Sequence, residues 1–123
     1  MATAVKDAVT FQTSTTHATS TSDTTPSSVD LSTSLGCVIT AEIINAAATF
    51  TAGCYVIVQV SNDNSDFMEY ARATAGLGSG TTYTFTFVLP AAIKYAKVIF
   101  GGNTGTSADC TVEADGIKIT SIG

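Results

Sequence analysis

One residue in three of this 123-residue chain is β-branched, and this excess constrains the fold more than any other feature of the sequence. The chain contains 22 Thr, 10 Val and 9 Ile, together 41 residues. Branching at Cβ restricts side-chain rotamers in a helix, whereas the same side chains pack well on the pleated surface of a sheet. The composition therefore predicts an all-β protein, and the length suffices for one domain with its own core.

Charged side chains make up only 12% of the chain, against roughly 25% in an ordinary globular domain. Five Lys and Arg face ten Asp and Glu, which gives a formal net charge of -5. Because a protein that binds nucleic acid needs a basic surface, we expect no nucleic-acid partner. The longest unbroken apolar run, residues 54–58, is far below the roughly 18 residues that a membrane-spanning helix needs, so we expect no membrane partner.

The amino-terminal residues lack the pattern of a secretory signal, since Lys6 and Asp7 stand where its apolar core would begin. We therefore expect a protein that is made in, and stays in, a cytosol-like compartment. Cys37, Cys54 and Cys110 form no CxxC pair, and an odd number is a poor disulfide framework and a poor zinc site. We predict that all three are buried small hydrophobic residues. The alternative is one disulfide plus a free thiol.

The first 34 residues differ in pattern from the rest. Residues 4–11 alternate between apolar and polar side chains and predict a first strand. In residues 12–34, 15 of 23 side chains are Ser or Thr, and such a segment buries too little surface to offset its ordering entropy. We therefore predict that residues 1–34 form an N-terminal strand and an extended Ser/Thr-rich arm, and that residues 35–123 form a β-sandwich domain.

The rest of the chain shows the alternation expected of half-buried strands, with turns rich in Gly, Asn and Asp between the segments. We predict a turn at residues 51–53 and flexible glycine loops at residues 75–81 and 101–108. The predicted strands are 37–45, 54–61, 67–74, 83–89, 93–100 and 110–122, the last with a bulge or turn at Asp115-Gly116. Together they predict an all-β sandwich or jelly roll of about seven or eight antiparallel strands.

The acidic turn 62–69 is a candidate calcium site, because its side chains bring several oxygen atoms together. These side chains are Asn62, Asp63, Asn64, Asp66 and Glu69. The spacing departs from an EF-hand loop, since the sixth position is Phe67 rather than Gly and the twelfth is Ala73 rather than Glu. A polar hairpin turn explains the same residues without an ion, and we predict such a turn.

Two further features could suggest catalysis or phosphate binding. Gly76, Gly78 and Gly80 are followed by no helix pattern and no Lys-Ser/Thr pair, so they predict a mobile loop rather than a phosphate cradle. His17 is the only histidine, and it lies in the Ser/Thr-rich arm. We expect it to be solvated or packed against the arm rather than held in a hydrolytic triad.

Paired acids for glycoside chemistry must face each other across a cleft. Three acids near one another in the sequence are Asp109, Glu113 and Asp115, and we expect them to face solvent on a strand and turn. The chain has no Trp, and the tyrosines that are candidates for an exposed or interface face are Tyr55, Tyr70 and Tyr95. We therefore predict no catalytic, cofactor-binding or metal-binding residues, no cofactor and no enzyme activity.

Two stretches of the chain carry a resemblance to a known class of proteins. Residues 56–67, Val-Ile-Val-Gln-Val-Ser-Asn-Asp-Asn-Ser-Asp-Phe, read as a strand, a Ser-x-Asp turn and an aromatic residue that opens the next strand. Residues 95–100, Tyr-Ala-Lys-Val-Ile-Phe, precede a Gly/Asn loop and complete the pattern. Over residues 54–122 the sequence resembles bacteriophage virion structural proteins of the small β-sandwich kind, although these often have Trp where this chain has Phe67.

The resemblance implies a non-enzymatic capsid decoration (cement) protein, assembled in the host cytoplasm and located on the outer capsid of the virion. Its implied partners are the major capsid protein and further copies of itself, as a homo-oligomer that is typically a trimer. We expect residues 1–34 to lie across the capsid or a neighbouring protomer and to gain order there. The alternatives are a tail, baseplate or receptor-binding component, and a carbohydrate-binding or adhesin module.

Overall fold

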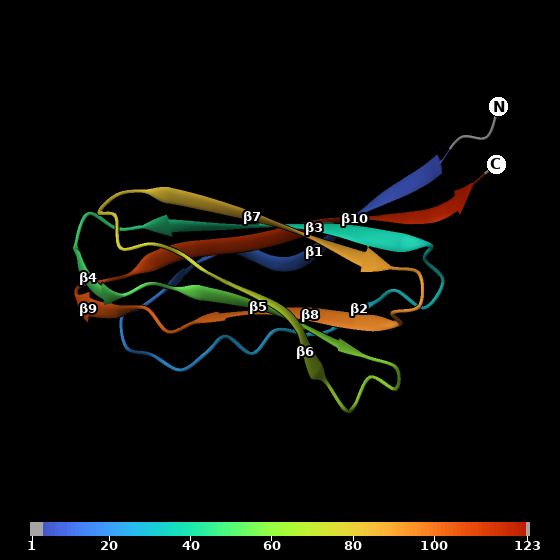
Figure 1. The fold of residues 1–123 in the computed structure, drawn as a ribbon, viewed down its shortest axis with the longest axis horizontal. Coiled ribbons are helices and arrows are strands. Elements are labelled where there is room, and N and C mark those ends of the chain that lie inside the picture. Colours follow the sequence, from blue (N-terminus) through green and yellow to red (C-terminus); the bar gives the residue numbers. More distant parts are fainter. Residues whose placement is uncertain (1–3, 123) are drawn as a thin grey trace.

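A computed structural model describes residues 4–122 as antiparallel sheets, two of them four-stranded and packed in two layers (Figure 1). This confirms the predicted all-β sandwich. Residues 1–3 and 123, at the outer ends of the two predicted segments, lie outside the described residues. The strands are β1 (Ala4–His17), β2 (Val29–Asp30), β3 (Gly36–Asn45), β4 (Thr49–Ala52), β5 (Tyr55–Ser61), β6 (Met68–Thr74), β7 (Thr82–Pro90), β8 (Tyr95–Gly101), β9 (Thr104–Thr106) and β10 (Cys110–Ile122). Within residues 4–122 no helix is long and apolar enough to cross a membrane.

The first sheet has the strand order β1-β10-β3-β7 and the second has the order β2-β8-β5-β6. Figure 1 shows them as an upper and a lower layer, with the short pair β4-β9 at the end away from the termini. The first and last strands are neighbours in the first sheet, so the two chain ends emerge side by side.

The core lies between the two sheets and follows the alternation of the sequence. On β3, Ile39, Ala41 and Ile43 are fully buried, as their shared face predicts. Both faces of β5 are apolar at its start, which is typical of a central strand, and β5 indeed pairs with both β8 and β6. The other largest fully buried apolar side chains are Phe100, Leu31, Leu89, Val56, Val58, Val98, Val112 and Cys54.

The prediction that an arm or loop begins at residue 12 is wrong, because β1 continues to His17. The second half of β1 pairs with β10 through two register shifts. This long-range pairing satisfies the backbone hydrogen bonds of a polar segment, and the composition of the segment alone could not indicate it. Residues 18–28 then lie along the edge of β8 in the same chain. The backbone N–H of Ser20 donates to the carbonyl of Asn103 at 2.9 Å, and that of Thr24 donates to the carbonyl of Phe100 at 2.9 Å.

The predicted bulge or turn at Asp115-Gly116 is also wrong, because β10 pairs with β3 without a shift from Cys110 to Lys118. The register shifts lie in the pairing of β1 with β10 instead, and the one opposite Asp115 and Ala114 places its extra residue, Phe11, in β1. Gly116 is required for another reason: a Cβ atom there would lie 2.6 Å from a ring carbon of Phe11 and 3.2 Å from Sγ of Cys37. The glycine thus makes room for two inward-facing side chains.

The structure differs from the sequence prediction at two short segments. The strand β4 overlaps the predicted turn at residues 51–53, and β9 lies within the predicted loop at residues 101–108. The two strands pair with each other. Neither segment has the apolar alternation of a longer strand, so local pattern did not indicate them. Each is ordered by a partner some fifty residues away in the chain.

We expect Gly116→Ala to lower the free energy of unfolding by about 1–3 kcal/mol, because the added methyl group must displace the buried ring of Phe11. Asp115→Ala is the matched control, since Asp115 is exposed on the opposite face of the same strand. It should change the stability by less than about 0.5 kcal/mol. Urea unfolding measures both, and a Gly116→Ala variant as stable as the parent would contradict this packing.

Candidate functional site

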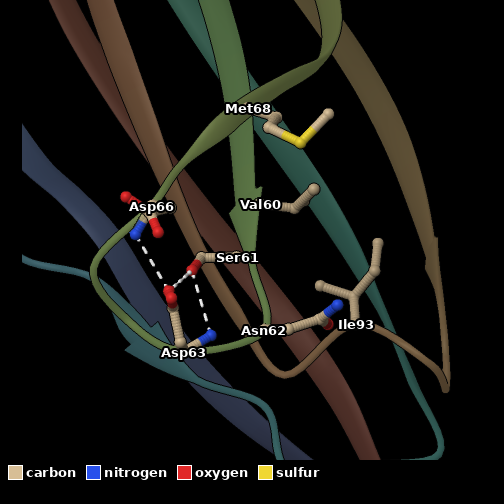
Figure 2. Close-up of a pocket in the computed structure, with 7 residues that line it drawn as sticks. All are labelled: Val60, Ser61, Asn62, Asp63, Asp66, Met68 and Ile93. Carbon is tan, nitrogen blue, oxygen red and sulfur yellow. Dashed lines mark hydrogen bonds between the residues drawn. The ribbon is translucent and has the colours of Figure 1, made fainter.

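The hairpin between β5 and β6 borders a surface hollow of about 280 Å³ (Figure 2). An apolar wall is formed by Val60, Met68 and Ile93. The polar rim consists of Ser61, Asn62, Asp63 and Asp66. This hollow contains most of the residues that the sequence singled out as a candidate calcium site.

One oxygen of the Asp63 carboxylate is engaged inside the turn. Its Oδ1 accepts hydrogen bonds from the backbone N–H of Asp66 and from Oγ of Ser61, each at 2.9 Å (Figure 2). It also accepts one from the backbone N–H of Ser65 at 2.9 Å. These donors, first the backbone N–H of Asp66, lower the pKa of Asp63 to about 2. Within residues 4–122 no group of three or more His, Cys, Asp or Glu side chains is arranged to hold a metal ion. The turn itself therefore explains the acidic sequence, and the predicted hairpin is confirmed.

His17 is buried, with 6% of its surface exposed, so the structure supports packing against the arm and not solvation. Its Nδ1 lies 2.6 Å from Oδ1 of Asn103, and its Nε2 lies 2.8 Å from the carbonyl oxygen of Ser22. The histidine of a hydrolytic triad must contact a carboxylate, and neither ring nitrogen of His17 does so. His17 instead joins the end of β1 to the arm and to the loop before β9.

Asn103 is the centre of this buried network, and sequence reasoning missed it. Its Nδ2 donates to the carbonyl oxygens of His17 at 3.0 Å and of Ala108 at 2.7 Å. Because Nδ2 faces two acceptors, the orientation of the amide is fixed, and Oδ1 accepts from Nδ1 of His17. The asparagine follows a Gly-Gly pair in an irregular segment, so no local signal marks its role.

The candidate acids are not brought together around a cleft. Oδ1 of Asp109 accepts a hydrogen bond from the backbone N–H of Thr19 at 2.9 Å. Glu113 lies directly opposite Glu42 on the outer surface of the first sheet, while Asp115 lies in another row of that surface. The Glu42–Glu113 pair was not predicted, because it depends on the long-range register of β3 and β10.

The three candidate tyrosines do not form one exposed aromatic face. Tyr55 donates its hydroxyl to Asp23, and this hydrogen bond raises the pKa of Tyr55 to about 12. Tyr70 is 46% exposed on β6, and Tyr95 is half-buried beside Asp30. The structure therefore offers no flat aromatic platform made by these three side chains.

All three cysteines are buried and free, which confirms the first of the two predictions for them. A hydrogen bond with the Cys110 thiol and burial both raise the pKa of Cys54. Burial likewise raises the pKa of Cys37. A raised thiol pKa disfavours the reactive thiolate, so Cys54 and Cys37 act as small core residues. The hydrogen bond with Cys54 lowers the pKa of Cys110, which is fully buried beside it.

The glycine loop has packing partners that the sequence did not indicate. Nδ2 of Asn45 donates to the carbonyl oxygens of Gly76 and Gly78, both at 3.0 Å. A Cβ atom on either glycine would lie within 2.8 Å of the Tyr83 hydroxyl. The loop leads into β7 and not into a helix, so it lacks the helix N-terminus that a phosphate cradle needs.

The outer surface of the first sheet carries aliphatic side chains in a row across three strands. Val88 on β7 lies opposite Val38 on β3, which lies opposite Ile117 on β10. Their exposed fractions are 66%, 41% and 51%. We call these three residues the outer aliphatic row. The next row is polar and consists of Thr86, Thr40, Asp115 and Thr10. Exposed aliphatic side chains grouped among hydroxyls are typical of a surface that contacts another protein.

No family model and no curated protein sequence matches the chain. Among solved structures, the chain is similar to infectious bursal disease virus Gx strain, with 14% identity and a TM-score of 0.62, and to the VP2 subviral particle of that virus, with 13% identity and a TM-score of 0.61. Each match covers 95% of this chain and 32% of the viral chain. The chain thus spans about a third of the length of these virus-particle proteins.

A bacterial structure shares the fold as well. The chain is similar to the K3 cleaved adhesin domain of Lys-gingipain from Porphyromonas gingivalis, with 18% identity and a TM-score of 0.54. The match covers 85% of this chain and 73% of that domain. At these identities the comparisons show that the β-sandwich fold is shared.

The Asp63 turn makes stability depend on pH in the acid range. A carboxyl group whose pKa is lowered in the folded state stabilises the fold at pH values above its ordinary pKa of 3.8. For Asp63 this contribution is lost as the pH falls toward about 2. We expect Asp63→Asn to be less stable than the parent at pH 7 and the difference to shrink across that window. Urea unfolding from pH 2 to pH 7 measures it, and a constant difference would contradict the turn's role.

We expect Asn103→Ala to destabilise the fold by at least about 2 kcal/mol, because it leaves two buried carbonyl groups without donors and each such group costs roughly 1–3 kcal/mol. The same change should expose residues 18–28 to proteolysis. Thr25→Ala, at an exposed position of that segment, is the control and should change neither property. Equal proteolysis of the two variants would count against the network as the lock of the arm.

Proposed function

We propose that the chain is a non-enzymatic structural subunit of a virus particle, namely a decoration subunit on the outer capsid of a bacteriophage. The observation that carries the proposal is the strand order. Apart from β4 and β9, eight strands form two four-stranded sheets, and the chain passes from one sheet to the other at every connection except β5–β6. We infer a jelly roll from this arrangement, and jelly rolls are common in viral capsid proteins.

The surface supports an assembly role. The outer aliphatic row exposes three apolar side chains on one sheet face, and only 12% of the residues of the chain are charged, so little long-range repulsion opposes close packing against another protein. The fold similarity to the virus-particle proteins fits the same interpretation. We propose the major capsid protein as the partner, with the subunit as a homo-oligomer, for which the sequence resemblance implies a trimer.

The hydrogen bonds of the candidate polar groups support a subunit without catalytic activity. Nδ1 of His17 donates to Asn103, whose Nδ2 donates to backbone carbonyl oxygens, and Oδ1 of Asp63 accepts hydrogen bonds within its turn. Each therefore has a structural explanation. We propose that the chain has no enzymatic activity and needs no cofactor.

A second candidate function is an adhesin or carbohydrate-binding module, which the similarity to the gingipain adhesin domain favours. Its ligand would occupy the hollow beside the β5–β6 turn, where an apolar wall meets a polar rim. A glycan array separates the two candidates, because a capsid subunit should bind no glycan. A tail, baseplate or receptor-binding component would be found on tails rather than capsids by labelling of intact particles.

For the capsid proposal, we expect the purified protein to rebind capsids from which it has been stripped, and Val38→Glu with Ile117→Glu to abolish this binding. The two charges would break the outer aliphatic row where both side chains are exposed, so the fold should be kept. Thr74→Glu, an exposed position on β6 in the other sheet, is the control and should bind like the parent. Cosedimentation measures the binding. Failure of the parent protein to rebind, or undiminished binding by the double variant, would overturn the proposal.

A further inference from the structure

The strand β7 forms an edge of the first sheet, and one side of its backbone has no strand partner among the described residues. The carbonyl of Thr81, just before β7, accepts a hydrogen bond from the N–H of Asn45 on β3. In an antiparallel ladder, alternate residues point both backbone groups to the same neighbour, so the odd-numbered residues of β7 bond to β3. The N–H and C=O groups of Thr82, Thr84 and Thr86 therefore point away from the sheet.

The other sheet edges carry features that prevent strand addition, and β7 lacks them. The edge strand β1 contains Lys6, Asp7 and three register shifts. The edge strand β2 is only two residues long, and β6 carries Glu69, Arg72 and a register shift. By contrast, β7 is nine residues long, has no charged side chain and pairs with β3 without a shift. Short edges, charges, bulges and proline are the usual protection of a free edge. Among the edges of the two four-stranded sheets β7 is the least protected, since it carries only Pro90 at its last position.

The inward face of β7 is also incompletely covered. Tyr83, Phe85 and Phe87 pack against the core, but each of them is only half-buried. In the neighbouring strand β3, every inward-facing apolar side chain from Ile39 to Ile43 is fully buried. A further strand beside β7 would cover the aromatic side chains that the present edge leaves open to water.

We propose that β7 pairs with β7 of a second copy of this chain, antiparallel and about a two-fold axis through Phe85, so that two first sheets become one eight-stranded sheet. The sequence of β7 is self-complementary in this register. Phe85 lies opposite Phe85 of the other copy, Tyr83 lies opposite Phe87, and Thr84 lies opposite Thr86. Aromatic pairs and Thr–Thr pairs across strands are among those that stabilise sheets.

The backbone hydrogen bonds agree with this register. Thr84 and Thr86 both point their backbone groups outward, so they exchange N–H···O=C bonds with Thr86 and Thr84 of the other copy. Phe85 then occupies a non-hydrogen-bonded position, where the two Cα atoms lie about 4.5 Å apart. A residue on the two-fold axis faces its own copy, which is the basis of the first test. On the same side of β7, the carbonyl of Val88 accepts a hydrogen bond from the Tyr70 hydroxyl at 3.5 Å, so Thr84 and Thr86 carry the pairing. Val88 is the one member of the outer aliphatic row on β7, and it would lie opposite Thr82 of the other copy. The pairing leaves Val38, Ile117 and the β5–β6 hollow free, so it does not rest on the proposed capsid binding.

The register is tested by Phe85→Cys, which we expect to form an intermolecular disulfide under mild oxidation. A Cα separation of about 4.5 Å lies within the range of roughly 4.4–6.8 Å that disulfides span. Phe87→Cys is the matched control: it removes the same side chain two residues along the same face, but faces Tyr83 of the other copy and should stay reduced. Non-reducing electrophoresis gives the result. Equal cross-linking of the two variants, or none for Phe85→Cys, would overturn the register.

The use of the free edge is tested by Thr86→Pro, measured by sedimentation equilibrium. Proline removes an N–H group that no bond within the chain uses, and edge strands tolerate proline at such positions. We expect the mass of the Thr86→Pro oligomer to be half that of the parent. Thr86→Val keeps the N–H group and the β-branch, so it should retain the parent mass. The pairing requires an even number of subunits, so the parent oligomer should be a dimer, or a hexamer if pairs join two trimers. A parent with an odd number of subunits, the isolated trimer included, or a Thr86→Pro variant of unchanged mass would overturn the pairing. If Thr86→Pro does not fold, the cysteine pair decides.

Discussion

The pairing of the first long strand with the last is the interaction on which the rest of the structure depends. It places β10 in the interior of the first sheet, between β1 and β3, and so completes the layer that covers the second sheet. It also puts His17 opposite Cys110, where the histidine can reach Asn103 and hold the arm against β8. Since this pairing joins residues about a hundred positions apart, the loop-closure entropy is paid before its contacts form, which predicts slow folding.

Most strands could be predicted from the sequence because their side chains alternate. The pattern of Tyr83, Phe85 and Phe87 against Thr84 and Thr86 reappears as half-buried and exposed positions of β7. The pattern failed where a strand is formed by polar residues. The second half of β1 and the pair β4–β9 lack apolar alternation, and they are strands only because distant segments offer backbone partners. A prediction from local sequence has no access to that partner.

The same limit explains what was foreseen of the surface and its polar groups. The turn at Asp63 is local, so the spacing of its residues was enough to predict a hairpin. The network of Asn103, the Glu42–Glu113 pair and the outer aliphatic row each join segments that are far apart in the chain. Their members are ordinary in isolation, and only the register of the sheets brings them together. A row of exposed side chains is thus a property of the fold and not of any motif.

The adjacent outer ends of β1 and β10 have a mechanical consequence. The two strands are antiparallel and leave the sandwich together, so a force that separates these ends acts across the strands, along their hydrogen bonds. Such a force loads one pair of bonds at a time and opens the ribbon from its tip. A force applied along the strands would load all the bonds together. The domain is therefore anisotropic under tension, weak when pulled from its paired ends and strong when pulled along the length of its sheets.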